Sequence, residues 1–136
     1  MTQEIAFEAA IDQPYEQAVE SVIQALKVEG FGVLASIDVR AALKEKLGVD
    51  FQSYVILEAC NPPLAHRALS ADARAGLMLP CPVTVEADMR GGSLVRIANP
   101  EVMITVGPFG ENPILQEVAS QARARLERVA NALKQS

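Results

Sequence analysis

Residues 54–85 read YVILEAC NPPLAHRALS ADARAGLMLP CPVTV, and this stretch contains both cysteines, the only histidine and four of the eight prolines of the 136-residue chain. From Tyr54 to Cys60 the side chains alternate between two largely apolar faces, which is typical of a central β-strand. Asn61 and Pro62 then indicate the start of a short helix, because asparagine caps a helix N-terminus and proline fits its first turn.

The second half of the stretch and the residues after it predict a pair of strands. Residues 77–82 are expected to be extended, since a residue that precedes proline avoids the helical region. They lead into a strand over residues 83–88, and Arg90-Gly91-Gly92 provides a tight turn into another strand over residues 93–98. The segment therefore predicts an antiparallel β-hairpin.

The N-terminal third predicts two strands, at residues 4–11 and 31–37, with a helix between them. The helix is amphipathic, because apolar side chains recur every three or four residues, at Tyr15, Ala18, Val19, Val22 and Leu26. Asp38 is a suitable cap for a further short helix that ends near Leu47. The chain then returns to the strand that begins at residue 54.

The C-terminal third predicts one long helix and leaves one segment open. The β-branched residues of 101–106 favour a strand, whereas Asn99-Pro100-Glu101 is typical of a helix start. Asn112-Pro113 opens the long helix, whose apolar residues recur every three or four positions, at Leu115, Val118, Ala122, Leu126, Val129 and Leu133. A helix with one such stripe is expected to pack across a sheet.

These elements together predict a single α+β domain over residues 1–136, with a mostly antiparallel sheet and helices on one face. A chain of this length buries roughly two-thirds of its surface on folding. Half of the residues are hydrophobic, yet tryptophan is absent and only 4% are aromatic, so the core is expected to consist mostly of small aliphatic side chains. So much apolar surface also predicts a homodimer, joined by sheet edges or by an apolar face.

Composition and charge exclude several classes of protein. The net charge of −5 and the calculated pI near 4.9 have the wrong sign for a nucleic-acid-binding surface, and the chain has no basic run. No apolar run reaches the 18 residues of a membrane span, and the N-terminus lacks the pattern of a signal peptide. A cytoplasmic location is therefore expected, where cysteines serve as reduced thiols, metal ligands or redox groups.

Familiar catalytic and cofactor motifs are absent from the sequence. It contains no GxGxxG, GxxxxGK[ST], GxSxG or HExxH pattern. A nucleophilic system with a histidine base would have to use His66, and no serine or cysteine stands in a recognisable elbow. Hydrolytic catalysis is accordingly disfavoured, and no cofactor can be named.

Cys60 and Cys81 form the candidate thiol or metal site. Antiparallel neighbouring strands would place them at the same end of the sheet, within reach of a disulfide or of a shared soft metal. His66 and Glu58 are the candidate further ligands, and such a set would suit zinc or copper, although the spacing matches no standard zinc module. The alternatives are a thiol redox or sulfur-carrying role, and two small buried side chains without chemistry.

A cleft between the sheet and the long helix is a second candidate site, for a small apolar ligand. The large side chains that could line it are Phe31, Tyr54, Met78, Met103 and Phe109. An ordinary role in the core is the alternative for each of them.

Several short motifs resemble domain-of-unknown-function family 302 of bacteria and archaea. They are Cys60-Asn61-Pro62, Ala65, Ala68-Leu69, Gly76, Leu79-Pro80-Cys81, Glu29-Gly30-Phe31 and Ile37-Asp38. The resemblance covers nearly the whole chain and implies a curved antiparallel sheet packed with helices in β-α-β4-α order, similar to the TATA-binding-protein-like class. It also implies dimers in crystals, and it implies no established reaction.

The functional expectation is therefore a small uncharacterised domain that acts as a non-catalytic binding or assembly module. The alternative is a thiol redox, sulfur-carrying or soft-metal-binding protein that uses Cys60 and Cys81.

Overall fold

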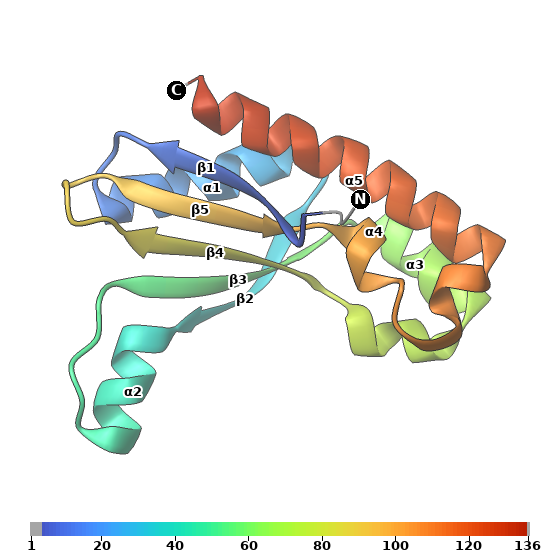
Figure 1. The fold of residues 1–136 in the computed structure, drawn as a ribbon, viewed down its shortest axis with the longest axis horizontal. Coiled ribbons are helices and arrows are strands. Elements are labelled where there is room, and N and C mark those ends of the chain that lie inside the picture. The colour runs from blue at the N-terminus through green and yellow to red at the C-terminus, as the bar shows by residue number, and fades with distance from the viewer. Residues whose placement is uncertain (1–3, 136) are drawn as a thin grey trace.

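The computed structural model describes residues 4–135 and contains one five-stranded antiparallel sheet (Figure 1). The strands lie in the order β1-β5-β4-β3-β2, so β1 and β2 form the edges. Their bounds are β1 Ala6–Ile11, β2 Gly32–Asp38, β3 Tyr54–Cys60, β4 Cys81–Ala87 and β5 Ser93–Ala98. The helices are α1 Tyr15–Val28, α2 Val39–Leu47, α3 Pro62–Ala71, α4 Pro100–Met103 and α5 Pro113–Lys134, and two 3-10 helices are η1 Ala73–Met78 and η2 Gly107–Glu111.

This architecture confirms the α+β class and the β-α-β4-α order, with α2, α3 and the short helices inserted between strands. The likeness to the TATA-binding-protein-like class stays a prediction. The segment at residues 101–106, for which the sequence left strand and helix open, is helical through Met103 and then forms a turn. The helix begins here because the Asn99 side chain caps α4, where it accepts a hydrogen bond from the Glu101 amide at 3.0 Å. Among the described residues, no helix is both long and apolar enough to cross a membrane.

The core lies between one face of the sheet and the two long helices. Alternate strand residues point inward, such as Val55, Leu57 and Ala59 on β3, and α1 and α5 pack on this face and against each other. The largest fully buried side chains are Leu26, Leu57, Ile97 and Leu126. The six apolar positions expected to form the buried stripe of α5 are all buried.

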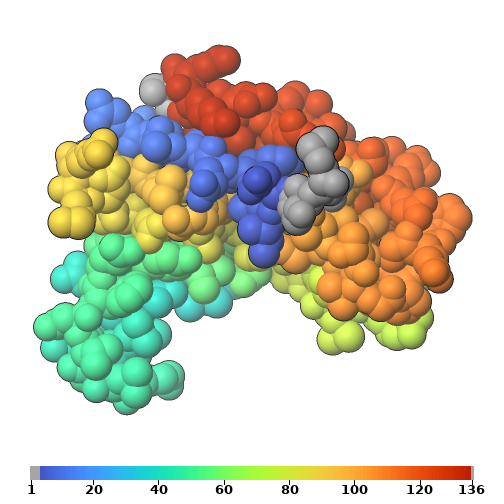
Figure 2. Space-filling view, viewed as in Figure 1, coloured from blue at the N-terminus to red at the C-terminus, as the bar shows by residue number. Residues whose placement is uncertain are grey.

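One part of the fold projects from the body. In β2 only Val33 is shielded to an intermediate degree and the other six residues are exposed, while α2 buries none of its side chains. We call residues 34–51, which run from β2 through α2 to the loop before β3, the arm. Figure 2 shows α2 standing away from the rest of the molecule. The arm is therefore a folded segment held mainly by its own pairing with β3.

Replacement of Leu126 by alanine tests the packing of α5 on the sheet. Leu126 is fully buried, so Leu126→Ala should lower the free energy of unfolding by about 2–5 kcal/mol, through lost transfer energy and the void left behind. Urea denaturation followed by circular dichroism measures this. The control is Leu77→Ala, because Leu77 is 83% exposed and its truncation should change stability by less than about 0.5 kcal/mol. Equal effects of both changes would contradict the described packing.

Candidate functional site

A cavity of about 260 Å³ lies at the end of the sheet where β3 stops and β4 begins. The end of β5, the helices α3, α4 and α5, and the two 3-10 helices complete its walls. Its lining residues are mostly apolar, and seven of them are alanines: Ala59, Ala65, Ala68, Ala75, Ala98, Ala119 and Ala122. These short side chains leave the space unfilled.

Asn61 is the one residue of this lining whose side chain carries an amide, and its polar atoms are already bonded. Its Oδ1 accepts a hydrogen bond from the Leu64 amide at 3.3 Å, and its Nδ2 donates to the Glu29 carbonyl at 3.4 Å. Asn61 is itself buried. The cavity therefore offers a ligand apolar contact and sulfur atoms rather than free amide or charged groups.

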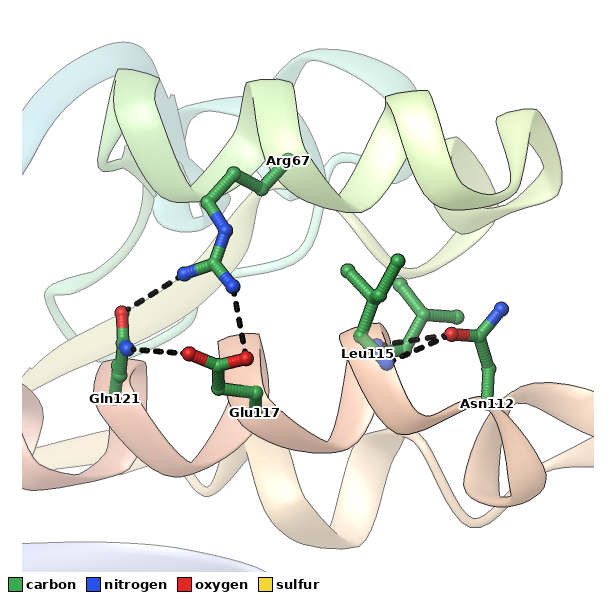
Figure 3. A network of polar contacts seen from close by, with 6 residues as sticks. Arg67, Asn112, Leu115, Glu117 and Gln121 are labelled. Atoms are coloured by element: carbon green, nitrogen blue, oxygen red, sulfur yellow. Dashed lines mark hydrogen bonds and ion pairs between the residues drawn. The ribbon is translucent and has the colours of Figure 1, made fainter.

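A polar network connects α3 with α5, two of the helices that line the cavity (Figure 3). Arg67 on α3 donates a hydrogen bond to Gln121 Oε1 at 3.2 Å and forms an ion pair with Glu117 at 3.1 Å, both on α5. Gln121 in turn donates to Glu117 at 3.2 Å. These groups are largely exposed, so the network contributes little to the free energy of folding.

One wall of the cavity is formed by η1. The sequence had predicted an extended chain from residue 77 onward. The structure instead has a 3-10 helix through Met78, which is capped by the Asp72 carboxylate through the Arg74 amide at 2.9 Å. This turn places Ala75 and Met78 in the lining. Leu77 also borders the cavity and is 83% exposed, so the cavity reaches the surface beside η1.

The structure brings together four of the five residues that the sequence suggested for an apolar cleft. Phe31, Met78, Met103 and Phe109 line the cavity, whereas Tyr54 does not. Tyr54 begins β3 and the cavity lies at the other end of this strand, about 20 Å away for seven extended residues. Tyr54 instead lies beside Phe51, with ring centroids 6.3 Å apart.

Cys60 and Cys81 lie at the same end of the sheet, as expected, and both line the cavity as free thiols. Cys81 pairs in register with Ala59 rather than with Cys60. Because side chains alternate along a strand, this register directs the two thiols away from one another at the strand ends. The arrangement favours two separate thiols over a disulfide.

The environment of Cys81 determines its chemistry. Burial first, and then the neighbouring Cys60 and Glu58, raise the pKa of the Cys81 thiol from 9.0 to about 11. At neutral pH this thiol is protonated, and a protonated thiol is a poor nucleophile. A redox or sulfur-carrying role that starts from the Cys81 thiolate is therefore disfavoured.

The other two candidate metal ligands do not reach the cavity. His66 is exposed on α3, and Glu58 lies on the face of β3 opposite to Leu57, outside the cavity lining. Within residues 4–135, no group of three or more histidine, cysteine, aspartate or glutamate side chains is close enough to hold a metal ion. The four candidates thus reduce to the two cysteines.

Comparison with known proteins identifies relatives of the same architecture. The model of a family described as "Domain of unknown function DUF302" matches residues 7–133. The crystal structure of an uncharacterized conserved protein DUF302 from Bacillus stearothermophilus is similar, with a TM-score of 0.84 and 30% sequence identity over 96% of this chain and 99% of that chain. No curated protein matches this chain.

The raised pKa of Cys81 predicts slow alkylation of the folded protein. In a Cys60→Ala variant at pH 8, iodoacetamide should modify Cys81 about 100-fold more slowly in the folded protein than in guanidinium chloride, since two pKa units change the thiolate population about 100-fold. Mass spectrometry over time measures both rates. A folded rate within about threefold of the unfolded rate would show that the thiolate is not suppressed.

Proposed function

The chain belongs to the DUF302 family, and we propose that it is a non-catalytic binding module whose cavity takes one small apolar ligand. The observation that supports this most directly is the cavity itself, about 260 Å³ of space lined by apolar side chains and open beside η1. Binding sites for small molecules are usually preformed hollows of this character.

The size of the cavity limits the ligand. An apolar cavity of about 150 Å³ stays dry and binds benzene, so the larger volume here suits a molecule of about two fused rings or a short branched chain. Contact with Phe31 and Phe109 would supply much of the apolar surface that a ligand buries. Met103 has a flexible side chain that adapts to irregular shapes.

The chemistry of the lining favours binding over catalysis. None of the described lining residues is a histidine, aspartate, glutamate, lysine or serine, which are the usual general acids, bases and hydroxyl nucleophiles. Cys81 is held protonated. A reducing compartment such as the cytoplasm, expected from the sequence, would keep both thiols reduced while a ligand binds.

Filling the cavity tests the proposal with naphthalene as the probe. Ala119→Leu adds bulk on the cavity side of α5, so it should weaken naphthalene binding at least about 10-fold, which corresponds to 1.4 kcal/mol. Ala65→Leu makes the same test from α3. The control Ala124→Leu lies on the exposed side of α5, outside the lining, and should bind like the original protein. Fluorescence titration measures all four proteins.

Failure of the original protein to bind naphthalene, or unchanged binding by both filled variants, would overturn the proposal. Native mass spectrometry of protein purified from its own source then identifies the natural ligand by its mass.

The arm favours a second role in assembly, as a homodimer contact. Five of its large apolar side chains are exposed: Leu34 (69%), Ile37 (44%), Leu47 (68%), Val49 (45%) and Phe51 (43%). Several large apolar side chains exposed on one projecting segment are typical of an interaction site on a folded protein. We propose that the arms of two copies pack together about a two-fold axis.

Charge and geometry favour a second copy of the chain as the partner. The arm is balanced in charge, with Arg40, Lys44 and Lys46 against Asp38, Glu45 and Asp50, whereas the chain as a whole has a net charge of −5. Two arms can therefore meet without the repulsion that two acidic surfaces would cause. A register shift between Val33 and Ala35 interrupts the regular edge of β2, so apolar packing should contribute more than continuous strand pairing.

Light scattering after gel filtration tests the dimer. The protein should elute at twice the 14.6 kDa chain mass, and the double change Leu34→Glu and Leu47→Glu should give monomers because it places charge in the apolar contact. The control is Val28→Glu, which is 82% exposed on α1 outside the arm and should leave the dimer intact. A monomeric original protein at micromolar concentration would refute the contact.

A further inference from the structure

Three of the helices that line the cavity begin with the same two residues, an asparagine followed by a proline. They are α3 at Asn61-Pro62, α4 at Asn99-Pro100 and α5 at Asn112-Pro113. The first turn of each helix contributes a residue to the lining: Leu64, Pro100 and Leu115. A helix N-terminus usually offers free backbone N–H groups, and these bind a carboxylate or a phosphate. Whether the cavity accepts an anionic ligand therefore depends on the state of these N–H groups.

The first turn of α3 has no free N–H group. Its first two residues, Pro62 and Pro63, are prolines and have no N–H. The Leu64 amide donates to Asn61 Oδ1 at 3.3 Å, and the Ala65 amide donates to the Asn61 carbonyl at 2.9 Å. The groups that could bind an anion here are thus absent or used within the protein.

The other two helices repeat this arrangement after their initial prolines. In α5, the Asn112 side chain accepts hydrogen bonds from the amides of Ile114 and Leu115, at 3.0 and 3.2 Å. In α4, the Asn99 side chain accepts from the Glu101 amide at 3.0 Å, and the Asn99 carbonyl accepts from the following amide at 3.1 Å. Within the part of the chain that the structure describes, none of the three first turns presents a free N–H to the cavity.

The walls between these helix ends offer no charge to a ligand. Among the described residues that line the cavity, none is an arginine, lysine, histidine, aspartate or glutamate. Pro80 and Pro82, on either side of the first residue of β4, add two further positions without an N–H. At the opening beside η1, the one charged residue of that helix is Arg74, whose Nη2 lies 2.8 Å from the Asp72 carboxylate. The cation nearest in sequence to the opening is therefore already paired.

We propose that the cavity admits only uncharged ligands, so that its natural ligand is a neutral hydrocarbon-like molecule rather than a fatty acid or an aromatic acid. This inference rests on the proposed binding function and names the chemical class of the ligand. An ionised carboxylate that enters the cavity loses its hydration and gains no donor in exchange, which is the costly case for a buried charge. A neutral molecule of the same size loses little hydration and gains dispersion contacts. Selection therefore acts through charge.

Two probes of nearly the same shape, 2-nitronaphthalene and 2-naphthoate, separate the effect of charge from that of size. The nitro group matches the carboxylate in shape and leaves the molecule neutral, whereas the carboxylate is ionised at pH 8, far above its pKa of about 4. Equilibrium dialysis of the whole protein measures both affinities beside that of naphthalene. We expect 2-nitronaphthalene to bind within about 10-fold of naphthalene, and 2-naphthoate to bind at least about 100-fold more weakly than 2-nitronaphthalene.

Equal affinities for the two probes would overturn the proposal, because the cavity would then tolerate the charge. Rejection of both probes, with naphthalene still bound, would assign the selection to size and would overturn it as well. The absence of naphthalene binding is a different result: it is the failure of the binding function itself, and the proposal falls with it.

A lysine placed in the lining tests the same inference from the side of the protein. Met103 is half-buried, so Met103→Lys can bring an ammonium group to the cavity while the stem of the side chain keeps its packing. This variant should bind 2-naphthoate at least about 10-fold more tightly than the original protein, because the carboxylate gains a charged donor. The matched control is Met89→Lys, which makes the same change of charge in the exposed turn between β4 and β5 and should leave the affinity unchanged.

Two outcomes of this comparison count against the proposal. One is an equal gain in Met89→Lys, which would show a general attraction between the protein and the anion. The other is no gain in Met103→Lys when circular dichroism shows that the variant is folded like the original protein.

Discussion

The buried side-chain amide of Asn61 holds together the three parts of the chain that surround the cavity. Asn61 directly follows the last residue of β3, its Oδ1 accepts a hydrogen bond from the Leu64 amide in the first turn of α3, and its Nδ2 donates to the Glu29 carbonyl at the end of α1. Gly30 lies directly against it, because a Cβ at this position would stand 3.0 Å from Asn61 Nδ2. The positive φ of Gly30, +84°, independently requires glycine there.

The same junction extends to α5. Arg125 donates a hydrogen bond to the Glu29 carbonyl at 3.2 Å, and Arg128 donates to the Glu29 carboxylate at 3.0 Å. The end of α1 is therefore the point at which α3 and α5 are both anchored. Further along, Arg67 links the same two helices again through its contacts with Gln121 and Glu117.

Local signals in the sequence were sufficient for most of the fold. Asn61, Asp38 and Asn112 each cap the helix that their position predicted, and the apolar periodicity of α5 identified its buried stripe. The conformation of the segment after Gly76 was harder to predict from the sequence. Its 3-10 helix depends on a cap from Asp72, and this competes with the preference for extended chain before Pro80. Local chemistry predicts such elements only when one preference dominates.

The candidate site was predictable in its residues but not in its arrangement. Cys60, Cys81 and four of the five cleft residues line one cavity, because the elements that carry them come together at the end of the sheet where β3 stops and β4 begins. Tyr54 was misplaced since alternation along β3 assigns a face and says nothing about which end of the strand a cavity occupies. The seven alanines were not recognised as lining residues, because a small side chain marks close packing and open space equally well in a sequence.

A cavity kept open by alanines also gives the protein a stability that varies with its surroundings. Space left unfilled forgoes dispersion contacts that a larger side chain would make. Any molecule that occupies this space in the folded state, and does not bind the unfolded chain, restores those contacts and shifts the folding equilibrium in proportion to its concentration. The unfolded fraction is the substrate of cellular proteases, so the lifetime of this chain would follow the supply of its occupant.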